Sequence, residues 1–128
     1  MLHGEPVFIN GDGETSRDFC FIDNTVQMNI LAATADHPDA ANQVYNVALN
    51  DQTTLTELFN SIRKELIARK PELVIPDPQY RDFRAGDVRH SRADISKAQN
   101  LLGYAPKYKI DEGMALSMDW YIDDLSNK

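Results

Sequence analysis

The sequence lacks most features that mark secreted, membrane-spanning and nucleic-acid-binding proteins. It has one cysteine, Cys20, so an internal disulfide is excluded, as is usual in a reducing compartment. We find no basic and apolar leader, and no apolar run approaches the roughly 18 to 20 residues that span a bilayer. The net charge is −7, which disfavours non-specific nucleic-acid binding. These absences predict a cytoplasmic protein with neither a membrane segment nor a nucleic-acid partner.

Arginine is also scarce, and its distribution is uneven. Four of the seven arginines lie in or directly after the stretch YRDFRAGDVRHS at residues 80–91. From Arg81 to Arg92, four arginines against two aspartates give a local charge of +2, which leaves −9 for the rest of the chain. A positive feature of this size suits one anionic ligand.

The patterning predicts one mixed α/β domain over residues 1–128. The length and the hydrophobic content of 42% are sufficient for a single core. Apolar runs at 6–11 and 16–22 flank an Asp-Gly turn signal, so we expect two neighbouring strands there. The run at 43–49 is typical of a buried strand, and the proline-broken stretch at 71–80 must be a loop or an edge strand.

Helical spacing of apolar residues predicts four helices, each starting at a capping residue. The expected starts are Asp23, Thr54, Asp94 and Asp111. Thr54 and Glu57 have the spacing of a capping box, and Gly103 is a normal stop for the third helix. The expected order is therefore β-β-α-β-α-loop-β-α-α. Because so few strands have an obvious neighbour, this order indicates either an irregular small domain or part of a larger fold.

Arg17 and Arg84 are the arginines best suited to hold a ligand. Each has an aromatic neighbour, Phe19 or Phe83, and small or acidic residues beside it. Two planar guanidinium groups can clamp a diphosphate from either side. Asp87, three residues after Arg84, is an acceptor suited to vicinal hydroxyls such as those of a ribose. An ion pair between Arg84 and Asp87 on a surface turn explains the same spacing equally well.

Other chemistry-bearing patterns indicate no site. Gly-Asp-Gly at 11–13 lacks the third glycine of a dinucleotide fingerprint and lies between two expected strands. The three histidines have no ligand-like spacing with Cys20 or with paired carboxylates, so no metal site is expected. Cys20, between two phenylalanines, is typical of a core thiol, and no nucleophile with a catalytic base is indicated.

Four stretches of the sequence carry a family resemblance. In chain order they are VFINGDGETSRDFCFIDNTVQMNILAA, QVYNVA, TTLTELF and YRDFRAGDVRHSRADISKAQNLLGYAPKY. They resemble the C-terminal third of an extended short-chain dehydrogenase/reductase, most of all the UDP-N-acetylglucosamine 4-epimerase group. In that family the C-terminal part binds the nucleotide-sugar and the N-terminal Rossmann part binds NAD.

The resemblance implies roles for the residues that match the family's motifs. Arg17 matches the arginine of the RDF segment, which contacts the diphosphate, and Arg84 matches the second diphosphate arginine. Asp87 matches the acidic residue that binds the ribose hydroxyls. The resemblance therefore implies that these three side chains surround a uridine diphosphate.

The resemblance also implies a preference for acetylated sugars. Ser91 lies seven residues after Arg84, where relatives restricted to non-acetylated sugars have a bulky tyrosine. A small side chain there leaves volume for an acetamido group, which favours UDP-GlcNAc or UDP-GalNAc. Asn10 and Gly11 match positions that border the sugar-nucleotide groove.

The catalytic parts of the family are not in this sequence. Its chemistry needs a glycine-rich NAD loop and a Tyr-x-x-x-Lys pair, and neither is present. We therefore expect no catalytic residue and no cofactor in this chain, which would not epimerise alone. The implied fold assigns residues 24–49 to the Rossmann sheet, so this segment needs the missing Rossmann domain, a second copy, or a rearrangement onto its own domain.

Other classes of function remain open at this point. The chain fits a stand-alone nucleotide-sugar-binding or regulatory module, and it fits a remnant used only for association. Part of a related NAD-dependent sugar dehydratase is a further alternative.

Overall fold

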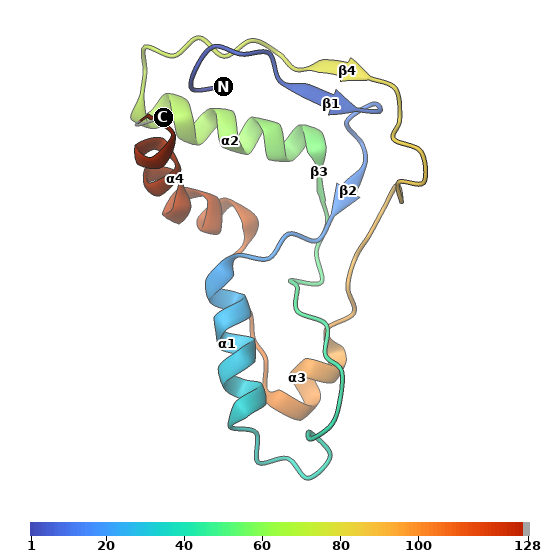
Figure 1. Cartoon of the computed structure of the whole chain (residues 1–128). Coiled ribbons are helices and arrows are strands. Elements are labelled where there is room, and N and C mark those ends of the chain that lie inside the picture. Colours follow the sequence, from blue (N-terminus) through green and yellow to red (C-terminus); the bar gives the residue numbers. More distant parts are fainter. Residues whose placement is uncertain (127–128) are drawn as a thin grey trace.

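The computed structural model describes residues 1–126, in which four helices are combined with four short strands (Figure 1). This confirms the mixed α/β class. In chain order the elements are β1 (Phe8–Asn10), β2 (Ser16–Arg17), α1 (Ile22–Ala33), β3 (Thr53–Thr54), α2 (Leu55–Arg69), β4 (Gln79–Arg81), α3 (Ser96–Leu102) and α4 (Ile110–Ser126).

The strands form two separate two-stranded sheets. β1 pairs with β4 in parallel, and β2 pairs with β3 antiparallel. The expectation that the first two strands are neighbours is therefore wrong. After β1 the chain does not turn back on itself, because the N–H of Gly11 continues the contact with β4 by donating to the carbonyl of Arg81 at 2.8 Å. The stretch at 71–80 approaches β4 as a loop, and β4 is an edge strand as expected.

The strand expected at 43–49 is also wrong. These residues are irregular, and within residues 1–126 no ladder partner lies beside them. Tyr45 and Val47 instead pack against a core cluster, and the Tyr45 hydroxyl donates a hydrogen bond to the carbonyl of Ala40 at 2.7 Å. A short apolar run becomes a strand only when an edge is available to pair with it.

Two hydrophobic clusters divide the chain into an upper and a lower part (Figure 1). The α2/α4 cluster lies under β1, and its buried members are Ile9, Phe59, Leu66, Ile75, Met118 and Ile122. The α1/α3 cluster lies below, and its buried members are Met28, Ala40, Ala48, Ile95, Ala98, Leu102 and Tyr104. The Tyr104 hydroxyl donates to the carbonyl of Ala48 at 3.0 Å, and burial raises the pKa of this phenol.

The helix ends follow local capping chemistry. The Thr54 side chain accepts from the Glu57 backbone and the Glu57 carboxylate accepts from the Thr54 backbone, which confirms the capping box of α2. Gly103 ends α3 in a left-handed conformation with φ of +67°, also as expected. The cap expected at Asp94 is wrong, because Ile95 is the N-cap residue of α3. Asp94 lies one residue earlier, where its carboxylate accepts from the backbone and hydroxyl of Ser96. α4 begins at Ile110, one residue before the expected start.

The cap expected at Asp23 is wrong. Phe21 is the N-cap of α1, and Asp23 lies in the first turn. The polar anchor of this helix is the neighbouring Asn24, whose side chain is buried and accepts from the backbone of Lys107 at 2.8 Å. Its amide also donates to the carbonyl of Tyr108 at 2.7 Å. Asn24 therefore ties α1 to the chain that leads into α4.

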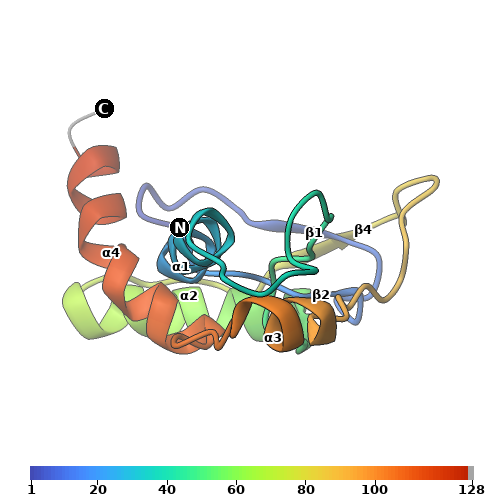
Figure 2. The same ribbon diagram turned by 90° about the horizontal axis from the view of Figure 1, so that it is seen from below.

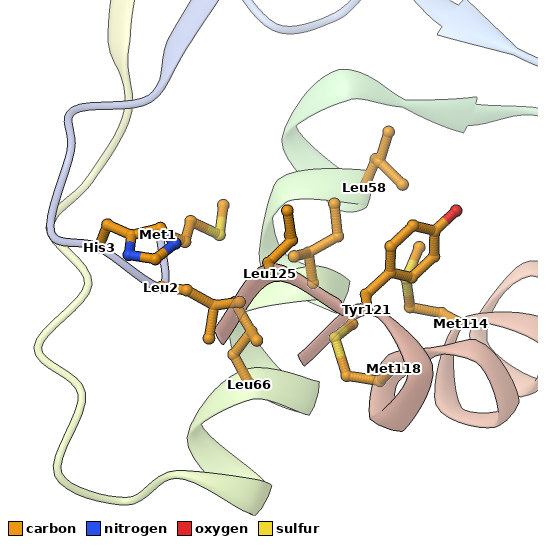
Figure 3. Close-up of a pocket in the computed structure, with 10 residues that line it drawn as sticks. Met1, Leu2, His3, Leu58, Leu66, Met114, Met118, Tyr121 and Leu125 are labelled. Carbon is orange, nitrogen blue, oxygen red and sulfur yellow. The ribbon is translucent and has the colours of Figure 1, made fainter. Parts of the chain in front are cut away.

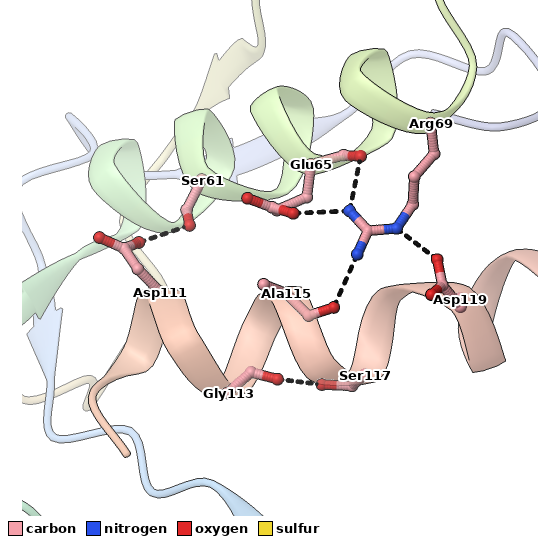
Figure 4. Close-up of polar contacts among 8 residues, drawn as sticks. All are labelled: Ser61, Glu65, Arg69, Asp111, Gly113, Ala115, Ser117 and Asp119. Carbon is pink, nitrogen blue, oxygen red and sulfur yellow. Dashed lines mark hydrogen bonds and ion pairs between the residues drawn. The ribbon is translucent and has the colours of Figure 1, made fainter.

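Polar contacts join α2 to α4 along their exposed edge (Figure 4). The Arg69 guanidinium contacts Glu65 at 2.6 Å on its own helix, pairs with Asp119, and donates to the carbonyl of Ala115 at 2.8 Å. About two turns earlier on α2, the Ser61 hydroxyl donates to the Asp111 carboxylate at 2.7 Å. These contacts tie the two helices together at two separate places along their length.

Candidate functional site

All six predicted site residues lie on two chain segments that run side by side, residues 10–17 and 81–91, here called the paired segments. They start together where Asn10 lies opposite Arg81 at the end of the β1–β4 ladder. The N–H of Gly11 then donates to the carbonyl of Arg81 at 2.8 Å. At the other end, the N–H of Ser91 donates to the carbonyl of Ser16 at 3.2 Å. Asn10, Gly11 and Arg17 are on the first segment, and Arg84, Asp87 and Ser91 are on the second.

Between these contacts the second segment forms an exposed loop, residues 82–88, here called the arginine loop. It projects from the chain after β4 in the view from below (Figure 2). The N–H of Asp87 donates to the carbonyl of Arg84 at 3.2 Å, which closes a four-residue turn. Gly86 has φ of +77° at the third position of this turn, where a type II turn requires a positive value.

An ion pair between Arg17 and Asp87 joins the two paired segments. The second terminal nitrogen of Arg17 donates to the carbonyl of Ser16 at 2.7 Å, so the guanidinium is held in one orientation. About a third of each charged side chain is accessible, at 31% for Arg17 and 34% for Asp87. Asp87 thus pairs with Arg17, and the alternative of an ion pair between Arg84 and Asp87 is wrong.

Arg84 and Ser91 are exposed side chains of the second segment. Among the residues that the structure describes, neither the Arg84 guanidinium nor the Ser91 hydroxyl has a hydrogen-bond or ion-pair partner. An arginine with five unused donors, close in sequence to the Arg17–Asp87 pair, is available to an anion from solution.

Gly11 fixes how closely the two paired segments approach. It is buried with φ of +84°, and the ring of Phe83 lies against its α-carbon. An added Cβ would lie 2.4 Å from the ring carbon Cε1 of Phe83. A side chain at position 11 would therefore have to displace the Phe83 ring, in addition to the strain of a positive φ.

Three polar anchors of the site were missed from the sequence. Asp12 pairs with Arg89 at 2.7 Å, so Arg89 holds the pKa of that carboxyl below its usual value, assisted by the backbone N–H of Glu14. The Ser16 hydroxyl is 2.9 Å from Nδ1 of His90. Both contacts join residues more than 70 positions apart, and no local spacing signals such a pair.

Asp18 is the third missed anchor. Its carboxylate accepts from three backbone N–H groups, those of Leu49 at 3.0 Å, Asp51 at 3.2 Å and Ala93 at 3.2 Å. One side chain therefore fixes the ends of two loops beside the paired segments. The only signal in the sequence was its place directly after Arg17.

Two further observations concern ions and membranes. Within residues 1–126, no group of three or more His, Cys, Asp or Glu side chains is placed to hold a metal ion. None of the helices in the described part of the chain is both long enough and apolar enough to cross a bilayer.

Comparison with known proteins shows to which family the chain belongs. Residues 1–117 match the family model described as GDP-mannose 4,6 dehydratase, and the relatives are sugar-nucleotide epimerases and dehydratases. The chain belongs to the extended short-chain dehydrogenase/reductase family. It is 31% identical over 122 residues to the UDP-glucose 4-epimerase of Mycolicibacterium smegmatis, covering 94% of this chain and 36% of that protein. It is also 31% identical to the dTDP-glucose 4,6-dehydratase of Haemophilus influenzae, covering 97% of this chain and 38% of that protein.

Solved structures of this family share the fold of the chain. The UDP-glucose 4-epimerase of Thermotoga maritima, solved with UDP-glucose, is 36% identical, with a TM-score of 0.81 over 98% of this chain and 37% of that one. The UDP-N-acetylglucosamine 4-epimerase of Methanobrevibacter ruminantium, solved with UDP-N-acetylmuramic acid, is 38% identical, with a TM-score of 0.81 over 96% of this chain and 36% of that one. The chain therefore spans little more than a third of these relatives, and it corresponds to their C-terminal part.

The residues of this chain do not fit NAD, which several solved relatives contain. Gly11 and Gly13 are the only glycine pair in the sequence with the spacing of a phosphate-binding loop. The space beside each of them is occupied by side chains of this chain. A Cβ on Gly11 would meet Phe83, and one on Gly13 would lie 2.2 Å from the Thr56 hydroxyl. No backbone cradle for a pyrophosphate is left there.

Proposed function

We propose that this chain is the nucleotide-sugar-binding portion of an NAD-dependent UDP-sugar 4-epimerase, and that its ligand is UDP-GlcNAc or UDP-GalNAc. Arg17 and Arg84 bind the diphosphate, and Asp87 binds the ribose hydroxyls. Ser91 leaves room for the acetamido group, and Asn10 and Gly11 border the sugar.

One observation carries this proposal. The Arg17–Asp87 ion pair brings together two residues 70 positions apart, and it does so next to the turn that displays Arg84. Two guanidinium groups and a carboxylate on adjoining segments supply the donors for a diphosphate and the acceptor for a diol. The solved epimerases with UDP-sugars, of the same fold at 36% and 38% identity, support this reading of the site.

We further propose that the chain does not catalyse alone. Its tyrosines are followed four positions later by Leu, Arg, Tyr, Glu and Leu, so none is part of a Tyr-x-x-x-Lys pair. In the family NAD carries the redox step, and the present residues do not fit it. Epimerised sugar produced by the chain with added NAD would refute this part of the proposal.

A partner for residues 24–49 is part of the same proposal. Val26, Ile30 and Val44 are exposed at 47%, 59% and 83%, so this surface remains apolar after Tyr45 and Val47 have packed inward. A Rossmann domain or a second copy of the chain would cover it. The cytoplasmic location stays a prediction.

Calorimetry with UDP and UDP-GlcNAc tests the ligand. We expect saturable heat from the wild-type chain and loss of that heat in Arg84→Ala, because the proposed diphosphate contact is removed. The variant should fold normally, since the Arg84 guanidinium has no partner among the described residues. Lys64→Ala removes the same charge from the exposed face of α2 and should bind like the wild type. No heat at millimolar ligand would leave only the association or remnant function.

A substitution at Ser91 tests the sugar. Ser91→Tyr should weaken UDP-GlcNAc binding at least about tenfold, or roughly 1.4 kcal/mol, while UDP-glucose binding changes little, since only the acetamido group would clash. Equal losses for both ligands would refute the acetyl-pocket role and leave diphosphate binding intact.

A sugar-dehydratase origin is the second candidate. The 31% identity to the Haemophilus influenzae dTDP-glucose 4,6-dehydratase over 97% of the chain favours it. Preference for dTDP-glucose over both UDP-sugars in the same titration would support this candidate against the epimerase.

A further inference from the structure

An apolar hollow lies between α2 and α4, and it offers few polar groups to a charged ligand (Figure 3). Its volume is about 530 Å³, and among the described residues that line it only His3 and Tyr121 have polar side chains. The contact between the paired segments has the opposite character, because Ser16 joins them through its N–H, its carbonyl and its hydroxyl. Ser16 is only 3% exposed, so its polar groups depend on these partners and not on water.

The main chain of Ser16 holds two of the proposed ligand-binding residues at once. Its carbonyl accepts from the Arg17 guanidinium at 2.7 Å and from the N–H of Ser91 at 3.2 Å. Its N–H donates to the carbonyl of Arg89 at 2.9 Å. A displacement of Ser16 would therefore move the arginine proposed for the diphosphate and the serine proposed for the acetamido group relative to each other.

The side chains of Ser16 and His90 form a further link between the paired segments. The Ser16 hydroxyl lies 2.9 Å from Nδ1 of His90, and the two residues are paired in an isolated parallel bridge. Successive side chains of an extended chain point to opposite faces. Arg17 and Ser91, the neighbours of this pair in sequence, are therefore expected on the face opposite to the one where the hydroxyl and the imidazole meet. The Ser16–His90 pair thus supports the ligand face from behind.

We propose, on the basis of the function proposed above, that Ser16 and His90 are positioning residues of the nucleotide-sugar site. Their hydrogen bond fixes the register of the paired segments, and this register sets the spacing between Arg17 and Ser91. A ligand that occupies only the diphosphate subsite needs this spacing less than a ligand that spans both subsites. UDP fills the diphosphate subsite alone, whereas UDP-GlcNAc spans both.

Calorimetric titration of the 128-residue chain with UDP and with UDP-GlcNAc tests this role, and the readout is the ratio of the two dissociation constants. Ser16→Ala and His90→Leu should each weaken UDP-GlcNAc binding relative to UDP binding by about three- to tenfold, the range that corresponds to one hydrogen bond. The double variant should lose no more than either single variant, because both substitutions remove the same hydrogen bond.

Two further variants make the result specific. His90→Asn retains a hydrogen-bonding group near the place of Nδ1, so it should keep the wild-type ratio. His37→Leu removes a histidine from the loop after α1 and should leave both dissociation constants unchanged. The free energy of unfolding in urea, measured for each variant, shows whether a change in the ratio occurs without a general loss of stability.

The outcomes separate this role from the proposed function. A wild-type ratio in both single variants, or additive losses in the double variant, would overturn the positioning role and leave nucleotide-sugar binding intact. If the wild-type chain binds neither UDP nor UDP-GlcNAc, the proposed function fails and the positioning role fails with it.

Discussion

Some charged side chains of the paired segments already have a partner within the chain, and others do not. Arg17, Asp87 and Arg89 are held by partners across the two segments, whereas Arg84 has none among the described residues. A bound diphosphate would have to share Arg17 with Asp87, which lowers the affinity that this guanidinium provides. Arg84 would meet the proposed ligand without such competition, so Arg84→Ala is the variant that best separates an effect on binding from an effect on stability.

Gly11 and Gly86 provide a matched pair of substitutions. Both have positive φ, but only a Cβ on Gly11 would collide, at 2.4 Å from Phe83, while Gly86 has open space around it. Gly86→Ala should cost about 1 kcal/mol from the left-handed conformation, and Gly11→Ala about 2–3 kcal/mol. Urea unfolding measures both free energies. The double variant Gly11→Ala/Phe83→Ala should recover part of the difference, and equal costs for the two single variants would contradict the clash.

The Asp12–Arg89 ion pair predicts a pH dependence. Since Arg89 lowers the pKa of Asp12 below 3.8 in the folded chain, the pair stabilises the fold above that pH and is lost as pH falls through the lowered value. Asp12→Asn should therefore reduce stability more at about pH 6 than at about pH 3, where most unfolded chains have this carboxyl protonated. Urea unfolding at both values checks this. High salt should shrink the difference at pH 6, because the pair is exposed. A loss of stability that is equally large at both pH values would contradict the prediction.

At the scale of elements, the sequence predicted helices better than strands. The capping box at Thr54 and the stop at Gly103 depend on residues three or four apart, so the pattern alone contains them. The partner of β1 is β4, about 70 positions away, and no turn signal between 11 and 13 could reveal it. The run at 43–49 has the composition of a strand but no edge to join. Composition predicts which secondary structure a segment prefers, whereas strand pairing depends on whether another strand lies beside it.

The same difference between local patterns and distant contacts applies to the candidate site. The resemblance indicated six candidate site residues one by one, and in the structure these residues lie on adjoining segments. The contacts made by Asp12, Ser16 and Asp18 were not predictable, because each joins residues far apart in the chain.

Thr54 provides the test at this scale. Thr54→Ala removes the side-chain half of the capping box and should cost about 1 kcal/mol, measured as the free energy of unfolding in urea. Thr53→Ala, at the neighbouring β3 residue that pairs with Arg17, is the control and should cost clearly less. Similar costs for both variants would show that the box does not stabilise α2.

For the whole molecule, the two clusters leave one face of α1 uncovered. Ile22, Val26 and Ile30 point away from the α1/α3 cluster and are 62%, 47% and 59% exposed, whereas Met28 on the other side is 3% exposed. A small core buries a smaller share of the surface than a large one, so a chain divided between two small cores leaves apolar side chains such as these exposed.

This face leads to a prediction about stability and association. Val26→Glu should change the free energy of unfolding by less than about 0.5 kcal/mol, whereas Met28→Ala should cost about 2–5 kcal/mol. Urea unfolding and sedimentation at several concentrations check both. A large cost for Val26→Glu, with loss of a dimer, would show that a second copy covers the face in solution.

The separation of the paired segments along the chain has a consequence for folding during synthesis. Arg17 and Asp87 are 70 positions apart, and the intervening chain contains α1 and α2. Closing a loop of that length costs about 4 kcal/mol of chain entropy before any contact across it is gained. On the ribosome, α1 and α2 can form as soon as they emerge, but Arg17 has no partner until the arginine loop is made. Both hydrophobic clusters need residues from 95 onward, which are made later still. The paired segments and the two cores can therefore become ordered only after most of the chain has been synthesised, and contacts this distant in sequence slow folding.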